Sequence, residues 1–210
     1  MVHYKLQYFD LRGLGEPIRL ILHYVGQDFE EKRIDFFSDE WLEFKKKTPY
    51  GLLPVLLVDG VPIAECRAIG RYLGKKFNLL GKTDLEAAQL DSIADFFLEY
   101  FMEARPYLFV LFGIPYKEND KEKLYNELWV PKNAETFPRL EKILKESGSG
   151  FLSKDGISWV DFFVAALNYT INKNLPETFR NFPEIKKHVE KIHGLPELQE
   201  YLGKRKVTDL

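Results

Sequence analysis

Cysteine is nearly absent from the sequence: Cys66 is the only one in 210 residues. One thiol excludes an intrachain disulfide framework and a metal site built from several thiolates. A chain without disulfides is typical of a reducing compartment, so the sequence predicts a cytoplasmic protein. The four histidines have no metal-ligand spacing, and no metal site is expected.

An excess of one charge is also missing, because 30 Lys and Arg residues stand against 32 Asp and Glu residues. Phosphate backbones are bound by basic surfaces, so nucleic acid is not an expected partner. No apolar run approaches the roughly 20 residues of a membrane-spanning helix. The first nine residues alternate in polarity and lack the apolar region of a signal peptide. No membrane partner is therefore expected.

Aromatic residues are abundant, with 17 Phe, 11 Tyr and 3 Trp, and supply ample material for a core. The first 80 residues carry both strand and helix signals, with an Asp-Gly turn that predicts a hairpin. The last two strands of such a unit are antiparallel, so its sheet is mixed and the fold is α/β. The expected strands and helices, in chain order, are strand 3–9, helix 16–25, strand 29–34, helix 38–47, hairpin 55–64 and helix 65–77.

Strand signals disappear after a linker at residues 78–83. Apolar residues at helical spacing then predict a long amphipathic helix through residues 93–108. A second helical pattern covers residues 120–146, with an interruption near Pro131. Ser158 and Asp161 form an S-x-x-D capping box before the apolar run 162–167. With two more helices near 184–192 and 196–202, the second part of the chain is predicted to be all-α.

Tyr8 is the first candidate site residue, because it ends the first strand just before a glycine-containing loop and a helix. Ligands of open α/β sheets lie beyond the carboxyl ends of the strands. A phenol near a helix N-terminus can also hold an anion. The alternative is a buried tyrosine on the same face as Tyr4 and Leu6, and the pattern alone favours this alternative.

Two further segments have the composition of a binding site. Leu53-Pro54 precedes a strand, where the proline is either an ordinary strand start or a cis residue. Glu65-Cys66 begins a helix, whose first N–H groups attract carboxylates. Cys66 is either a thiolate activated there or a small buried apolar group, and the second is the default for a lone cysteine.

An acidic stripe, formed by Asp91, Asp95 and Glu99, follows the spacing i, i+4, i+8 along the long helix. Unpaired like charges at that spacing repel mildly. A solvated helix face is the usual explanation, and a site for an amino group is the sharper one.

Four motifs together resemble those of the cytosolic glutathione transferases, in order and over essentially the whole chain. The Tyr-Phe-x-x-Arg-Gly opening and the short C-terminus are similar to the sigma class, especially its nematode members. That class includes glutathione-dependent prostaglandin D synthases. The motifs are Tyr8-Phe9 with residues 12–19 (Arg-Gly-Leu-Gly-Glu-Pro-Ile-Arg), residues 49–55 (Pro-Tyr-Gly-Leu-Leu-Pro-Val), residues 68–73 and residues 156–161.

The resemblance implies a thioredoxin-like glutathione-binding domain over residues 1–79 and a helical domain over residues 82–210 that forms the electrophile pocket. It implies a detoxifying homodimer that conjugates the glutathione thiolate to small, largely apolar electrophiles. Glutathione is then a co-substrate, and no cofactor is expected. The alternatives are a glutathione-dependent prostaglandin-type isomerase and a non-catalytic binder of haem or other apolar ligands.

The resemblance also implies roles for single residues. Tyr8 is the catalytic phenol that hydrogen-bonds the glutathione sulfur. Glutathione is held at its glycyl end by Trp41 and Lys45, at its cysteinyl unit by the segment Gly51, Leu52 and Leu53, at its γ-glutamyl end by Glu65 and Cys66, and by Glu99 of the partner subunit, with Asp95 in reserve. The expected walls of the electrophile pocket are Phe9, Leu14, Tyr100, Arg105, Tyr107 and Phe109.

Four positions depart from the family pattern. Cys66 stands where the family usually has Ser, and Glu65 where Gln is commoner, so weaker glutathione binding is expected because a thiol is a poorer donor than a hydroxyl. Leu14 replaces an Arg of vertebrate prostaglandin D synthases, which argues against the isomerase. Leu98 replaces an acid of those relatives, which argues against a metal between subunits.

Overall fold

A four-stranded mixed sheet organises the N-terminal part of the computed structural model, which describes residues 2–209. The edge strand β2 pairs with β1 in parallel, and the other two pairs are antiparallel. The strands, in the spatial order β2-β1-β3-β4, are β2 (Glu30–Ile34), β1 (Tyr4–Phe9), β3 (Val55–Val58) and β4 (Val61–Ala64). The hairpin turns at Asp59 and Gly60, both with positive φ, as an Asp-Gly turn requires.

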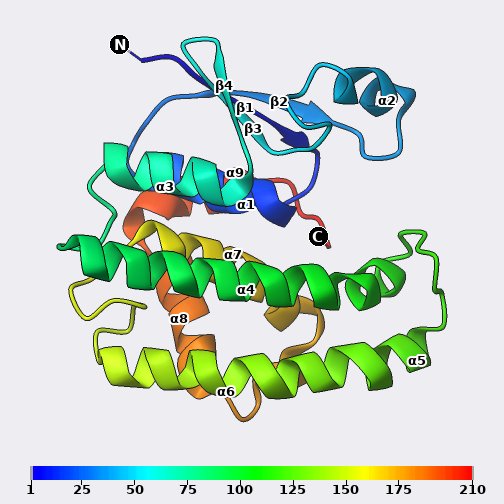
Figure 1. The fold of residues 1–210 in the computed structure, drawn as a ribbon, viewed down its shortest axis with the longest axis vertical. Coiled ribbons are helices and arrows are strands. Elements are labelled where there is room, and N and C mark those ends of the chain that lie inside the picture. Colours follow the sequence, from blue (N-terminus) through cyan, green and yellow to red (C-terminus); the bar gives the residue numbers. More distant parts are fainter. Residues whose placement is uncertain (1, 210) are drawn as a thin grey trace.

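Three helices accompany the sheet: α1 (Glu16–Tyr24), α2 (Asp39–Lys45) and α3 (Cys66–Lys76). Helices α1 and α3 lie between the sheet and the C-terminal helices (Figure 1). Tyr4 and Leu6 point from β1 into the same core as Ile69 of α3, and all three are fully buried. The sheet, helix pair and helical part therefore form successive layers.

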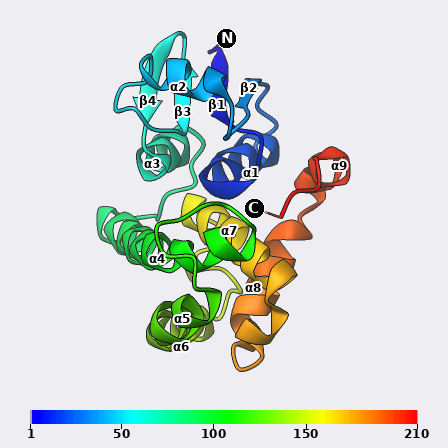
Figure 2. The same cartoon turned by 90° about the vertical axis from the view of Figure 1, so that its right-hand side faces the viewer.

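The remainder of the chain is helical. Helix α7 lies at its centre and is buried along most of its length (Figure 2). The helices are α4 (Asp84–Leu111), α5 (Lys121–Leu124), α6 (Val130–Ser147), α7 (Trp159–Asn174), α8 (Pro183–His193) and α9 (Gln199–Lys204), with short 3-10 turns at Pro176–Phe179 and Pro196–Leu198. Another 3-10 turn, Gly13–Gly15, precedes α1 in the N-terminal part. Within residues 2–209, no helix combines the length and the apolar character needed to cross a bilayer.

The predicted fold class is confirmed, and so are its finer signals at several points. The chain between α5 and α6 forms a π-helical turn, Tyr125–Trp129, so the expected interruption precedes Pro131, which lies in the first turn of α6. Ser158 N–H donates to Asp161 Oδ2 at 2.8 Å, which completes the predicted capping box. Helix α4 begins at Asp84, earlier than its apolar pattern indicates, because its first turns are mostly exposed and Thr83 caps them.

Helices α3 and α7 approach closely where the two parts of the chain meet. A Cβ atom at Gly70 would lie 2.4 Å from the Trp159 ring, and one at Gly74 would lie 2.8 Å from it. Trp159 is 1% exposed, and its backbone N–H donates to Leu79 O at 2.9 Å. The two glycines thus make room for the indole that joins the sheet layer to the helical layer.

Candidate functional site

Strand register gathers three separate segments at one edge of the sheet. Gln7 pairs with Val55 across β1 and β3, and Val55 pairs with Ala64 across β3 and β4. The residues that end β1, precede β3 and follow β4 therefore share this edge. They are Tyr8-Phe9, Leu53-Pro54 and Glu65-Cys66, three of the segments singled out from the sequence; the Leu53–Pro54 peptide bond is cis.

Tyr8 lies against the loop that follows its own strand. Its side chain is 6% exposed, and its hydroxyl oxygen accepts the Leu14 backbone N–H at 2.9 Å. A Cβ atom at Gly13 would lie 2.6 Å from that oxygen, and one at Gly15 would lie 2.4 Å from the ring. Among residues 2–209 the hydroxyl proton of Tyr8 has no hydrogen-bond acceptor. Tyr8 is thus both a buried tyrosine and a phenol with one donor left to offer.

Burial raises the pKa of Tyr8 to about 12, and the nearby Cys66 of α3 acts in the same direction. The Leu14 N–H, Arg19 of α1 and Arg105 of α4 oppose that rise. The Arg19 guanidinium lies 5.7 Å from the centre of the Tyr8 ring. At neutral pH the phenol therefore keeps its proton and is a hydrogen-bond donor rather than a base.

The segment between α2 and β3 adds a second wall to this edge. Trp41 packs edge-on against Phe9, with ring centres 4.9 Å apart, and Leu53 packs in the same cluster as Tyr8. The Lys45 side chain runs beside Gly51, where a Cβ atom would lie 3.3 Å from its Cε. The structure brings together these predicted residues, while neighbouring Leu52 is 54% exposed.

The start of α3 forms the third wall. Glu65 is exposed and has φ of 70°, a left-handed conformation that no pattern in the sequence indicates. Cys66 is 4% exposed, and burial raises the pKa of its thiol to about 12, with the Glu65 charge adding to the rise. The default interpretation of Cys66 is confirmed, and the reactive thiolate is wrong, because a buried thiol with so high a pKa stays protonated.

The acidic stripe divides into paired and unpaired members. Asp91 forms an ion pair with Arg71, and Asp95 pairs with both Arg67 and Arg71, at distances of 2.7–2.8 Å. These pairs join α3 to α4, and Arg67 and Arg71, spaced i, i+4, were the signal that sequence reasoning missed. Glu99 is exposed and has no ion pair within residues 2–209, which leaves it available to a ligand.

The structure brings together only some of the residues predicted to line the electrophile pocket. The Phe9 ring centre lies 5.4 Å from that of Tyr8, Leu14 contacts the Tyr8 oxygen, and Arg105 lies 5.0 Å over the Phe109 ring. Arg105 and Phe109 are one turn apart on the same face of α4.

Tyr100 and Tyr107 lie roughly on the opposite face of α4 from Arg105, in the helical core. The Tyr100 hydroxyl donates to Asn133 Oδ1 at 2.8 Å, and the Tyr107 ring packs 5.1 Å from that of Trp129. Both side chains are less than 5% exposed. The helical spacing turns them toward α6 and the π-helical turn, away from the side of α4 that carries Arg105.

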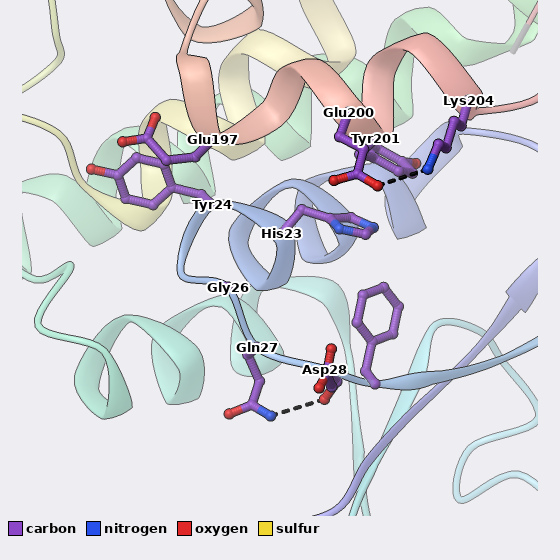
Figure 3. A pocket seen from close by; sticks show the side chains of 10 residues that line it. His23, Tyr24, Gly26, Gln27, Asp28, Glu197, Glu200, Tyr201 and Lys204 are labelled. Carbon is purple, nitrogen blue, oxygen red and sulfur yellow. Dashed lines mark hydrogen bonds and ion pairs between the residues drawn. The ribbon is translucent and has the colours of Figure 1, made fainter.

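A surface cavity of about 670 Å³ lies elsewhere, between α1 with its following turn and α9 (Figure 3). His23 stacks on Tyr201 there, with ring centres 4.1 Å apart. The residues that line it, from His23 to Lys204, include none of the predicted site residues. Within residues 2–209, no group of three or more His, Cys, Asp or Glu side chains is placed to hold a metal ion.

Two family profiles and several known proteins match this chain. Residues 4–75 match the profile described as glutathione S-transferase, N-terminal domain, and residues 108–205 match that of glutathione S-transferase, C-terminal domain. Glutathione S-transferase 1 of Ascaris suum is 40% identical over 208 residues, which cover 99% of each chain.

Solved structures of similar proteins share the fold over nearly the whole chain. A structure titled as monomeric Na-GST-3, a glutathione S-transferase of the hookworm Necator americanus, is 41% identical with a TM-score of 0.90 and covers 99% of this chain and all of the other. A Nu-class GST from Haemonchus contortus is 38% identical, with a TM-score of 0.88 over the whole of both chains. Prostaglandin synthase D of Nilaparvata lugens is 32% identical, with a TM-score of 0.86 over 98% of this chain and all of the other.

Proposed function

The chain belongs to the glutathione S-transferase family, and on that premise we propose that Tyr8 donates a hydrogen bond to the sulfur of bound glutathione and so holds it as the thiolate. The protein is a transferase that conjugates glutathione, its co-substrate, to electrophiles. The observation that carries the role of Tyr8 is its hydroxyl, which accepts the Leu14 N–H and keeps its own proton unshared within residues 2–209.

The required stabilisation is modest. A free thiol titrates near about pH 8.5, so only a few per cent is ionised at neutral pH. A hydrogen bond to a charged acceptor contributes roughly 1.5–3 kcal/mol, which corresponds to about 1–2 pKa units. The Leu14 N–H polarises the Tyr8 oxygen and strengthens its remaining donor. The thiolate then attacks an electrophilic carbon, and a carbon–sulfur bond forms as the leaving group departs with its electron pair.

Each wall of the site suits a different part of the glutathione molecule. Lys45, which is exposed and runs beside Gly51, suits the glycyl carboxylate, with Trp41 on the same helix. The backbone of Leu53, which precedes the cis-proline just before β3, suits the cysteinyl unit. The first N–H groups of α3, next to Cys66, suit the γ-glutamyl carboxylate, and Glu65 suits its ammonium group.

The second substrate fits beside the sulfur, against Leu14, Phe9, Arg105 and Phe109. These side chains offer apolar surface with one guanidinium, which favours a largely apolar electrophile that carries a polar or anionic group. We extend the role of pocket wall to these four residues only.

Substitution of Tyr8 tests the central proposal. Tyr8→Phe removes the donor but keeps the ring, so turnover with a general electrophile is expected to fall about tenfold or more while glutathione binding persists. Steady-state kinetics and glutathione-affinity retention measure the two effects. Tyr4→Phe is the matched control, since Tyr4 is a buried tyrosine of the same strand and face. Unchanged turnover in Tyr8→Phe would contradict the proposal.

The oligomeric state is the second part of the proposal: a homodimer in which Glu99 reaches the glutathione of the partner subunit. Sedimentation velocity is expected to give twice the chain mass of 24.6 kDa. Glu99→Gln is expected to raise the KM for glutathione several-fold, and Glu103→Gln, one turn further along α4, is the control. A single species of monomer mass would contradict the dimer. That outcome is a real alternative, because the similar structure of Na-GST-3 is described as monomeric.

Within the family, the Tyr-Phe-x-x-Arg-Gly opening supports the sigma class, and we place the protein in the cytoplasm with a detoxifying role. The division into domains 1–79 and 82–210 is proposed with it. A glutathione-dependent isomerase is the second candidate, favoured by the likeness to prostaglandin synthase D of Nilaparvata lugens. Isomerisation of a prostaglandin-type endoperoxide without conjugation would select it, and retention on glutathione without any turnover would select a non-catalytic binder.

A further inference from the structure

The loop between β1 and α1, residues 10–15, contacts Tyr8. It is also held by buried charged residues that the conjugation chemistry does not use. Arg12 is 4% exposed, and Glu16 and Arg19 are each 1% exposed. Burial of three charged groups is costly unless each finds partners. Their partners show what the loop is tied to.

The Arg12 side chain binds backbone carbonyl groups of the C-terminal segment, residues 205–209. One guanidinium nitrogen donates to Thr208 O, and another donates to Asp209 O at 2.9 Å. The second nitrogen also donates to Thr170 Oγ1 of α7 at 3.2 Å. The segment returns from α9 to the region between α1 and α7 (Figure 2).

Glu16 ties the other end of the loop to the same C-terminal region. Its carboxylate pairs with Arg205, accepts the Tyr201 hydroxyl at 2.9 Å, and pairs with Arg19 at 3.2 Å. Arg19 in turn donates to Leu11 O at 2.8 Å. Both ends of the loop therefore depend on contacts outside it.

The backbone connects these anchors to the Tyr8 hydroxyl. Arg12 O accepts the Glu16 N–H at 2.9 Å, which closes the turn, and Leu14 within it presents its N–H to the Tyr8 oxygen. The turn packs so closely on the Tyr8 ring that a shift of the loop moves this N–H relative to the hydroxyl.

We propose that Arg12 is a positioning residue, which clamps the carbonyls of residues 208 and 209 and thereby keeps the Leu14 N–H on the Tyr8 oxygen. The C-terminal segment is then part of the catalytic apparatus although it touches no substrate. This inference rests on the proposed role of Tyr8. Arginine suits the task because its planar fork spans two carbonyls in succession, which a lysine ammonium cannot do.

The inference has a distinctive kinetic signature. When the loop loosens, the Tyr8 oxygen loses its N–H donor and the phenol becomes a weaker donor to the glutathione sulfur. The pKa of the bound thiol then rises, and kcat falls at neutral pH. The KM for glutathione stays nearly constant, because the proposed anchors for the two ends of the molecule, on α2 and α3, do not contact Arg12.

The experiment compares Arg12→Met with a variant that lacks residues 207–210. The deletion variant removes the two carbonyls without altering a buried side chain. It therefore tests the role of the clamp even if Arg12→Met fails to fold. Val207→Ala is the matched control, because that side chain is 83% exposed in the same segment. The thiolate of bound glutathione is titrated by its ultraviolet absorbance, alongside kcat and KM, with circular dichroism as a check of folding.

We expect both variants to raise the pKa of the bound thiol by about half a unit to one unit and to lower kcat several-fold, with KM within about twofold. Val207→Ala is expected to match the wild type. Tyr8→Phe is titrated alongside. A shift in Tyr8→Phe with none in the deletion variant overturns this inference alone, whereas no shift in Tyr8→Phe overturns the role of Tyr8 itself. Lower kcat at an unchanged thiol pKa also overturns the inference, since it indicates a merely structural role.

Discussion

The buried Tyr8 phenol and the buried Cys66 thiol have similar pKa values but differ in the chemistry that each can perform. Burial raises the pKa of both Tyr8 and Cys66 to about 12. A phenol that keeps its proton remains a donor to an anion, so the shift leaves Tyr8 able to act. A thiol that keeps its proton is a poor nucleophile, so Cys66 loses one. Residue type, rather than the direction of the shift, decides what each can do.

Cys66 is expected to resist alkylation in the folded protein. Its raised pKa keeps the thiol protonated at pH 8, and its burial shields it, so labelling by iodoacetamide should be at least about tenfold slower than in urea. Mass spectrometry of timed samples measures the rates. Cys66→Ser supplies the unlabelled control and should retain activity. Equal labelling rates in folded and unfolded protein would rule this out.

Single residues were predictable where a local signal existed. The strand end placed Tyr8, and the base rate for a lone cysteine placed Cys66 in the core. The partners of Arg12 were not predictable, since its acceptors lie 196 and 197 residues away and are backbone carbonyls that carry no sequence signature.

At the scale of elements, helix faces decided which predictions survived. On α4, the charge of Arg105 acts on Tyr8 and Phe109 lies under the Arg105 guanidinium, whereas Tyr100 and Tyr107 face the helical core. The sequence offered aromatic residues on both faces and no means to rank them. The end of α8 shows a similar dependence on packing: His193 is stacked on Tyr169 of α7, with ring centres 4.3 Å apart.

His193 is expected to make the protein less stable in mild acid. Burial lowers its pKa to about 4 from 6.5, with Arg205 and Arg12 acting in the same direction and the Val189 carbonyl and Glu16 opposing it. The folded protein thus binds a proton less readily than the unfolded chain, and stability is complete above pH 6.5 and is lost as the pH falls toward 4. The loss amounts to about 3 kcal/mol at most.

Urea unfolding at several pH values between 4 and 7 measures this slope. His193→Gln removes the titrating group, so its unfolding free energy should fall less steeply than that of the wild type. Parallel slopes in the two proteins would count against a role for His193.

At the scale of the whole molecule, the contact of α3 with α7 holds the sheet layer to the helical layer. Gly70 and Gly74 make room for the Trp159 indole, and ion pairs from α3 to α4 lie beside it. The order of strands and helices in the sequence predicted both layers. Their mutual packing was not predictable, because a glycine in a helix carries no sign of the ring that fills its space.

Gly70→Ala is expected to destabilise the fold by about 1–3 kcal/mol, because its Cβ would lie 2.4 Å from a buried ring that cannot easily move. Equilibrium unfolding in urea measures the difference. Gly203→Ala on α9 is the control, since a Cβ there meets nothing within 4 Å, and it should be neutral or slightly stabilising. A neutral Gly70→Ala would show that Trp159 has room to shift.

The pairing of Gln7 with Val55 and of Val55 with Ala64 has a consequence for how the protein matures. The binding edge is formed by segments of the chain that are more than forty residues apart. A nascent or partly refolded molecule with only its first strand and helix therefore lacks a complete binding surface. Retention of the tripeptide is therefore expected only after the hairpin has docked. Affinity capture of refolding samples reports that docking directly, without any spectroscopic label.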